Sequence, residues 1–233
     1  MINGIDYIAF LKIGKKENLQ KLQNGNLYMK EAKFFRDVET KYKKVGMGDS
    51  YDSCIVQRNS PVWINGIKMP NADFMSITNN LDEKTPIFCC MCLKQSDFIY
   101  DSKRKHFILN KKRFDIDRLK KDFGNYVLVI PYPECFIGRI RSYCQKQSID
   151  FRFKEVIYVD YTKRDNNWHK LYENDLSHFF IKDKSFSNQK EFRLLLANLF
   201  TDDDKDFYSL DIPEGFKDFT KIVPIEDILK LEY

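Results

Sequence analysis

A short alternating segment late in the chain carries the residue types best suited to chemistry. Gln189, Glu191 and Arg193 are each separated by one residue. The apolar residues Phe192 and Leu194 occupy the alternate positions. Because side chains alternate along a β-strand, the three polar groups should share one face while the apolar ones enter the core. The sequence therefore predicts a carboxylate flanked by an amide and a guanidinium at the mouth of a sheet. The plainer alternative is that Glu191 and Arg193 form a surface ion pair on an edge strand.

Other residues with reactive side chains fit their sequence context better as structural groups. Cys90-Met91-Cys92 brings two thiols to one face of a strand, but zinc sites need four convergent ligands, so we predict no metal. His178 lies in an apolar stretch from Leu176 to Phe180, where a half-buried structural histidine is expected. The glycines are scattered and match neither the P-loop nor the dinucleotide-binding pattern.

Basic clusters could bind an anionic partner. They are Lys41/Lys43/Lys44, Lys103/Arg104/Lys105 and Lys111/Lys112/Arg113, the last two near Tyr100, Phe107 and Phe114. Lysines and arginines with interleaved aromatic residues could contact phosphates and stack bases, so nucleic acid is one possible partner, at least weakly and without sequence preference. Acidic residues near each cluster favour the alternative of a solvated loop surface. A net charge of +5 permits anionic partners without requiring them.

The chain resembles a large uncharacterised family of bacterial and phage proteins in short pieces spread over most of its length. The matching pieces are Phe10-Leu11-Lys12-Ile13-Gly14, Asn24 to Met29, Phe34 to Asp37, Gly48-Asp49-Ser50-Tyr51 and Lys182 to Arg193. That family in turn is similar to ADP-ribosyltransferases, which bind NAD in a cleft between two small sheets. The resemblance implies an α+β (mixed α/β) fold with a split, strongly bent sheet and peripheral helices.

Gln189-Lys190-Glu191 matches the Gln/Glu-x-Glu motif of the ADP-ribosyltransferases. The resemblance implies that Glu191 is the catalytic carboxylate, which holds a ribose hydroxyl of NAD and stabilises the oxocarbenium-like transition state. It also implies that Gln189 acts with Glu191 and helps to choose the acceptor.

The same resemblance suggests where NAD itself would bind. Tyr28 or Phe35 could stack on the nicotinamide, and Lys12 in the first strand could meet the pyrophosphate. Arg193, beside Glu191, is expected to contact the cofactor as well. The chain departs from the family at the first strand, where the usual residue is Arg or His and only Lys12 stands near the expected place.

These residues predict an NAD-using ADP-ribosyltransferase or NAD glycohydrolase that could act in conflict between phages and bacteria. One alternative is a non-catalytic protein of the phage anti-defence type that captures a nucleotide, or a host or phage protein, in the same cleft. The second alternative is a nucleic-acid-binding protein that uses the basic clusters.

The elements that must position these groups alternate evenly along the chain. Apolar residues at helical spacing predict helices over residues 14–25, 35–42, 115–123, 134–147 and 175–180. Apolar runs predict strands over residues 26–29, 87–93, 126–130, 155–161, 192–197 and 221–224, with a helical turn after the last. Asn65-Gly66 between two apolar runs predicts a tight hairpin over residues 62–69.

Composition sets the outer limits of the prediction. No linker or composition shift divides the chain, so a single mixed α/β domain over residues 1–233 is expected. The start lacks the pattern of a secretory signal, and no window approaches the ~20 apolar residues of a membrane span. Most of the six cysteines lie in apolar runs, as reduced thiols do, so we expect a cytoplasmic protein with no membrane partner.

Overall fold

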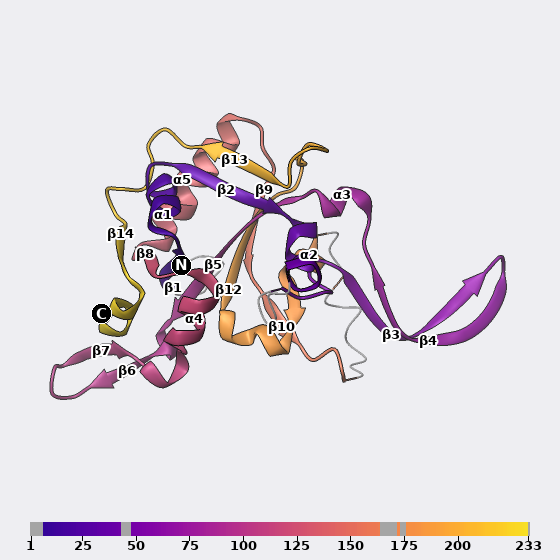
Figure 1. Ribbon diagram of the computed structural model, residues 1–233, viewed down its shortest axis with the longest axis horizontal. Helices are drawn as coiled ribbons and strands as arrows, with labels where there is room; N and C mark the ends of the chain where they lie inside the picture. The colour runs from indigo at the N-terminus through magenta and orange to yellow at the C-terminus, as the bar shows by residue number, and fades with distance from the viewer. Residues whose placement is uncertain (1–6, 43–47, 164–171, 173–175, 233) are drawn as a thin grey trace.

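Most strands of the chain assemble into a large antiparallel sheet (Figure 1). The computed structural model describes residues 7–42, 48–163, 172 and 176–232. The strand order is β13 (Phe207–Asp211), β2 (Asn26–Glu31), β5 (Pro86–Lys94), β1 (Tyr7–Gly14), β8 (Tyr126–Ile130) and β14 (Lys221–Pro224). β12 (Glu191–Leu196) also pairs with β5, and β9 (Phe151–Glu155) pairs with β12. With its helices, this confirms the prediction of a mixed α and β fold.

The sheet opens along one edge of β5. On one side, β12 pairs with β5 continuously from Ile87 to Met91. On the other side, β2 pairs with β5 only at Pro86 and Ile87, and β1 takes over from Met91 onward. Among the described strands, none pairs with residues 88–90 on that second edge. β1 and β2 therefore diverge, and the central strand is left uncovered between them.

Helices pack on both faces of the sheet, because adjacent residues of each strand point in opposite directions. Phe10 packs with buried residues of α1 (Lys16–Gln23) and α5 (Pro133–Lys146), including Leu19 and Ile140. The next residue, Leu11, packs on the other face with Leu119 of α4 (Ile116–Phe123) and with the 3₁₀ helix η5 (Ile225–Lys230). The central strands are covered on both sides, which explains their almost continuous apolar sequence.

Smaller elements surround the sheet. β3 (Ile55–Ile64) and β4 (Ile67–Ile77) form a long hairpin at one end of the molecule, and β6 (Phe98–Asp101) and β7 (His106–Leu109) form a short one at the other end (Figure 1). α2 (Ala32–Tyr42), α3 (Asn80–Glu83) and the 3₁₀ helices η1 (Gln95–Asp97), η2 (Lys111–Arg113), η3 (Ser177–Phe180) and η4 (Lys184–Gln189) connect the strands. Asn65 and Gly66 both have positive φ, which confirms the predicted hairpin turn.

One predicted strand is wrong. Residues 155–161 do not form a single strand, because the chain changes partner in the middle of the apolar run. β9 ends at Glu155 beside β12, Val156 donates its N–H to the carbonyl of Glu191, and β10 (Ile157–Val159) then pairs in parallel with β11 (Ile181–Asp183). The apolar pattern continues through the switch, so periodicity alone does not reveal it.

A few predictions fall on parts of the chain that the structure does not describe. The helix predicted over residues 175–180 appears as η3, and its residue 175 lies outside the described residues. Lys43 and Lys44 of the first basic cluster also lie outside them. Within the described residues, no helix combines the length and apolar character needed to cross a membrane.

Candidate functional site

A cleft of about 730 Å³ lies where the sheet opens. Its volume falls within the range of small-molecule sites. Five of the residues predicted from the sequence line it, and they come from five different elements: Lys12 of β1, Tyr28 of β2, Phe35 of α2, Gln189 of η4 and Glu191 of β12. The fold therefore brings together side chains that lie far apart in the sequence.

Lys12 occupies the opening between β1 and β2. Its Nζ donates a hydrogen bond to the carbonyl oxygen of Cys89 at 2.5 Å and lies 4.5 Å from the centre of the Phe88 ring. Cys89 belongs to the stretch of β5 that has no strand partner on this edge, so the ammonium group satisfies a carbonyl that the split would otherwise leave free. The same contact holds a positive charge inside the cleft.

Aromatic rings form one wall of the cleft. Tyr28 stacks on Phe207 with ring centres 5.0 Å apart, yet 45% of Tyr28 stays exposed. Lys30 lies 4.6 Å from the Phe34 ring and is neutralised by Asp206, whose two carboxylate oxygens are both 2.7 Å away. This wall can therefore accept a planar ring without adding a free charge.

Arg193 lies behind the cleft and is fully buried. Its Nε and Nη2 donate to the two carboxylate oxygens of Glu191 at 2.7 and 3.3 Å. Nη1 and Nη2 donate to the two oxygens of Asp52 at 2.7 Å each, and Nη1 also donates to the carbonyl of Phe179 at 2.7 Å. A guanidinium group has five N–H donors, and all five are used. Arg193 is thus positioned to hold Glu191 rather than to contact a cofactor directly.

The surface-pair alternative for Glu191 and Arg193 is wrong. β12 is paired on both sides, with β5 and with β9, so it is not an edge strand. All of its six residues are buried. The predicted alternation is confirmed from Glu191 onward: Phe192 and Leu194 pack in the core on the α5 face, and the two charged side chains point to the opposite face. Gln189 does not belong to this alternation, because it lies in η4 and Lys190 after it has a left-handed backbone with φ of +45°.

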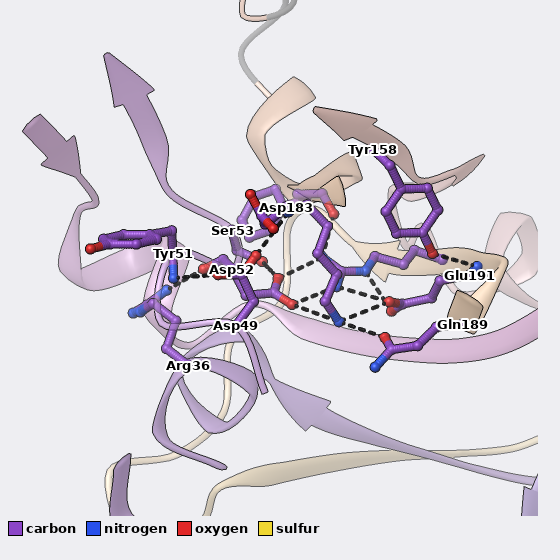
Figure 2. A network of polar contacts seen from close by, with 12 residues as sticks. Arg36, Asp49, Tyr51, Asp52, Ser53, Tyr158, Asp183, Gln189 and Glu191 are labelled. Atoms are coloured by element: carbon purple, nitrogen blue, oxygen red, sulfur yellow. Dashed lines mark hydrogen bonds and ion pairs between the residues drawn. The ribbon is translucent and has the colours of Figure 1, made fainter. Parts of the chain in front are cut away.

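Lys182 of β11 connects the two motif residues. Its Nζ lies 2.9 Å from the amide oxygen of Gln189, 3.1 Å from Oε2 of Glu191 and 3.4 Å from Oδ2 of Asp52. Figure 2 shows this network, with Asp52 on one side and Gln189 and Glu191 on the other. Two hydrogen bonds and an ion pair with Asp52 surround the ammonium group, which explains how a lysine with almost no exposure is accommodated.

Asp52 comes from the loop between α2 and β3, and that loop is tied down by Asp49. The Asp49 carboxylate accepts the backbone N–H groups of Tyr51 at 2.9 Å and of Asp183 at 3.0 Å, and the Asp49 carbonyl accepts the N–H of Asp52 at 2.8 Å. Arg36 of α2 also donates to the Asp52 carbonyl at 3.3 Å. These contacts deliver the Asp52 carboxylate to Arg193 in a fixed orientation.

The charges of the network keep its carboxylates ionised. Burial alone would raise the pKa of Glu191, but the positive charges of Arg193 and Lys182 outweigh burial and hold that pKa well below its usual range. The same balance lowers the pKa of Asp52. Conversely, burial would lower the pKa of Lys182, but Glu191 and Asp52 raise it. The buried group thus contains two cations and two anions.

Neither a protein-family model, a curated protein nor a solved structure matches this chain. The chemistry of the cleft must therefore follow from its own residues.

Glu191 is suited to one kind of catalytic work. A carboxylate with a strongly lowered pKa is a poor general base, because it gains little by accepting a proton. A negative charge held rigidly by buried cations is, however, well suited to stabilise positive charge that develops nearby. The cleft can thus support a reaction that passes through a cationic centre.

Possible metal ligands do not cluster among the described residues. They include no group of three or more His, Cys, Asp or Glu side chains placed to hold an ion. His178 is buried and lies 3.3 Å from a carboxylate oxygen of Asp82, which fits the structural role expected of it.

Sequence reasoning missed two members of the network, Asp52 and Lys182. The sequence gives a weak indication that Lys182 is buried, because it directly follows the apolar run Phe179-Phe180-Ile181. Asp52 had none, because it lies among Asp49, Ser50 and Ser53, residues typical of any solvent-exposed turn.

Proposed function

We propose that the cleft binds NAD and that the protein cleaves the nicotinamide–ribose bond, passing ADP-ribose to an acceptor or to water. The observation that supports the proposal is that both motif residues, Gln189 and Glu191, line the same cleft as Lys12, Tyr28 and Phe35. These are the residues that the resemblance to ADP-ribosyltransferases implies. A cleft at an opening of a sheet is also the kind of site that this resemblance implies.

In the proposed reaction, the bond between the ribose C1′ and the nicotinamide nitrogen breaks, and its electron pair stays with nicotinamide. Positive charge develops on the ribose, and the fixed negative charge of Glu191 stabilises it. The nucleophile, an acceptor group or water, then bonds to C1′ and loses its proton to solvent. Lys12 provides a cation for the pyrophosphate, and the ring of Tyr28 or Phe35 provides a stacking surface for a base.

The test is release of nicotinamide from NAD, measured with the protein alone and with cell lysate. Glu191→Gln should lower turnover by about 10²–10³-fold, the usual effect of one electrostatic group. Gln189→Ala should reduce transfer to an acceptor more than hydrolysis, because that position is expected to help choose the acceptor. Tyr28→Ala should raise KM, whereas the exposed Tyr132 does not line the cleft and Tyr132→Ala should leave KM unchanged.

Glu191→Gln also removes a buried charge, so its folding must be checked by circular dichroism before its turnover is interpreted. If the wild type releases no nicotinamide under any condition and calorimetry detects no NAD binding, the proposal is wrong.

One observation favours a second candidate, a cleft that binds a nucleotide without cleaving it. Both carboxylate oxygens of Glu191 already accept hydrogen bonds from Arg193 or Lys182. A carboxylate whose oxygens both accept hydrogen bonds within the protein can stabilise the walls of the cleft without catalysing a reaction. Binding of NAD in calorimetry without any release of nicotinamide would favour this candidate over the enzyme.

A further inference from the structure

The net positive charge of the protein is concentrated in one segment. Residues 95–121 contain nine Lys and Arg and four Asp and Glu, compared with 39 and 34 in the whole chain. The rest of the chain therefore carries 30 of each and is electrically neutral. A charge of +5 gathered in 27 residues creates a much stronger local field than the same charge spread over the chain.

The fold presents this segment on the surface. It comprises η1, the β6–β7 hairpin, η2 and nearly all of α4, and the hairpin extends from the body at the end opposite β3 and β4 (Figure 1). Lys103 and Lys105 lie in the exposed turn of the hairpin, and Lys111 and Lys112 lie exposed in η2, after the other end of β7. At ~3.3 Å per residue, the six steps along the chain from Lys105 to Lys111 span up to about 20 Å.

The acidic residues of the segment do not neutralise these lysines. Asp97 is buried and pairs with Arg113 at 3.3 Å and with Lys190 at 2.5 Å. Asp101 caps the hairpin turn by accepting the backbone N–H groups of Lys103 and Arg104. Within the described part of the chain, the exposed lysines of the hairpin turn and of η2 form no ion pair: Lys103, Lys105, Lys111 and Lys112.

An exposed aromatic ring lies beside them. Tyr100 is 58% exposed, and its ring packs edge-on against Phe107 at 5.3 Å, which leaves ring surface open to solvent. Below it, Phe98 and Leu109 bury the base of the hairpin in the core, so the ribbon is firmly attached to the body. We define the basic surface as Tyr100, Lys103, Lys105, Lys111 and Lys112.

We propose that the basic surface binds single-stranded nucleic acid. The phosphates of a nucleic acid strand lie at regular intervals and can contact the ammonium groups at both ends of β7. The exposed ring of Tyr100 provides a stacking surface for a base. An acidic protein or a lipid surface could satisfy the charge but would not use the ring of Tyr100 in this way. The proposal does not depend on the chemistry of the cleft.

The test uses fluorescence anisotropy with a labelled, single-stranded oligonucleotide of about 16 nucleotides. If four to five cations release counterions from the strand, affinity should fall by about 50- to 130-fold between 50 and 200 mM salt. Lys111→Glu/Lys112→Glu should weaken binding at low salt on the order of tenfold and make the salt dependence less steep. Tyr100→Ala should weaken binding to the single strand more than binding to a duplex.

A matched control separates local contacts from net charge. Lys146→Glu/Lys217→Glu changes the net charge by the same amount at two exposed positions outside the segment. This control should bind nearly as well as the wild type. Equal losses for the two double variants would overturn the proposal, as would undetectable binding by the wild type at 50 mM salt. The proposal would also be wrong if the wild type bound anionic lipid vesicles but not oligonucleotides. That result would favour a membrane surface as the partner.

Discussion

Arg193 loses contact with water when the chain folds, so each of its N–H groups needs an acceptor inside the protein. The fold meets this need with Asp52, Glu191 and the carbonyl of Phe179. Burying such a network costs desolvation free energy. Removing one partner costs still more stability, because it leaves a charge buried without compensation. Glu191 is therefore fixed before any ligand arrives, which is the condition for a carboxylate that acts by its charge.

This reasoning predicts a large effect for Asp52→Asn. The substitution keeps the shape of the side chain but leaves Arg193 and Lys182 facing a single carboxylate. Breaking a buried ion pair typically costs about 3–5 kcal/mol, so the melting temperature should fall by roughly 10 °C. Differential scanning calorimetry can measure the fall directly.

The control for Asp52→Asn is Asp204→Asn, because Asp204 is exposed. An exposed position should change stability by less than about 0.5 kcal/mol. If both variants melted at the temperature of the wild type, Asp52 would not be an essential partner of Arg193.

At the residue scale, the sequence predicts a site only where its members are local. Glu191 and Arg193 alternate along β12, so alternation is enough to place their side chains together, and Gln189 lies in η4 only two residues before Glu191. The bond from Arg193 to Asp52 joins residues 141 positions apart. Such a contact depends on how the loop after α2 packs against β12, and no short-range pattern in the sequence records it.

At the scale of elements, the spacing of apolar residues correctly predicts a helix or strand that packs through one regular face. α4 shows this well: Asp115 caps its first turn, Leu119 is buried and Gly124 ends it with positive φ. The prediction fails at Val156, because there the chain leaves β12 for β11 without interrupting its apolar pattern. Strand partners are set by tertiary packing, which local spacing does not encode.

Gly25 offers a test of how one element joins the next. It lies between α1 and β2 with φ of +102°, and an added Cβ would lie 2.0 Å from the carbonyl oxygen of Ile212. Gly25→Ala should therefore lower the free energy of unfolding by about 2–4 kcal/mol, through both backbone strain and the clash. Urea denaturation monitored by circular dichroism measures this difference.

Gly138 is the matched control, because it lies exposed in α5 and an added Cβ would meet nothing within 4 Å. Gly138→Ala should raise the free energy of unfolding by about 0.5–1 kcal/mol, since alanine favours the helix. If Gly25→Ala left the free energy of unfolding unchanged or raised it, the contact with Ile212 would not control the α1–β2 junction.

At the scale of the whole molecule, the cleft and the basic surface are two regions of different character. The cleft lies where β1 and β2 diverge, whereas the basic surface lies on the β6–β7 hairpin and on η2. α4 links the two regions. Its last two residues, Asp122 and Phe123, line the cleft, and the residues before them belong to the positively charged segment 95–121. A nucleic acid strand on the hairpin and a small molecule in the cleft would therefore be held by neighbouring elements.

The six cysteines test how completely the fold protects its interior. All are free, but only Cys135 is exposed. Burial raises the pKa of the Cys54 and Cys144 thiols to about 11 and that of Cys92 to about 12, and it raises the pKa values of Cys89 and Cys90 as well. Since the thiolate is the reactive form, these five should react slowly in the native protein.

Titration with a thiol-reactive chromophore at neutral pH should therefore find one fast thiol in the native protein and all six after denaturation without reductant. In Cys135→Ser, the fast phase should disappear and the remaining five thiols should appear only on denaturation. Fewer than six in the denatured wild type, restored by a reductant, would show that disulfides form. A second fast thiol that persists in Cys135→Ser would instead point to Cys89, because it is only half-buried and lines the cleft. Its rate would then report how far the cleft opens in solution.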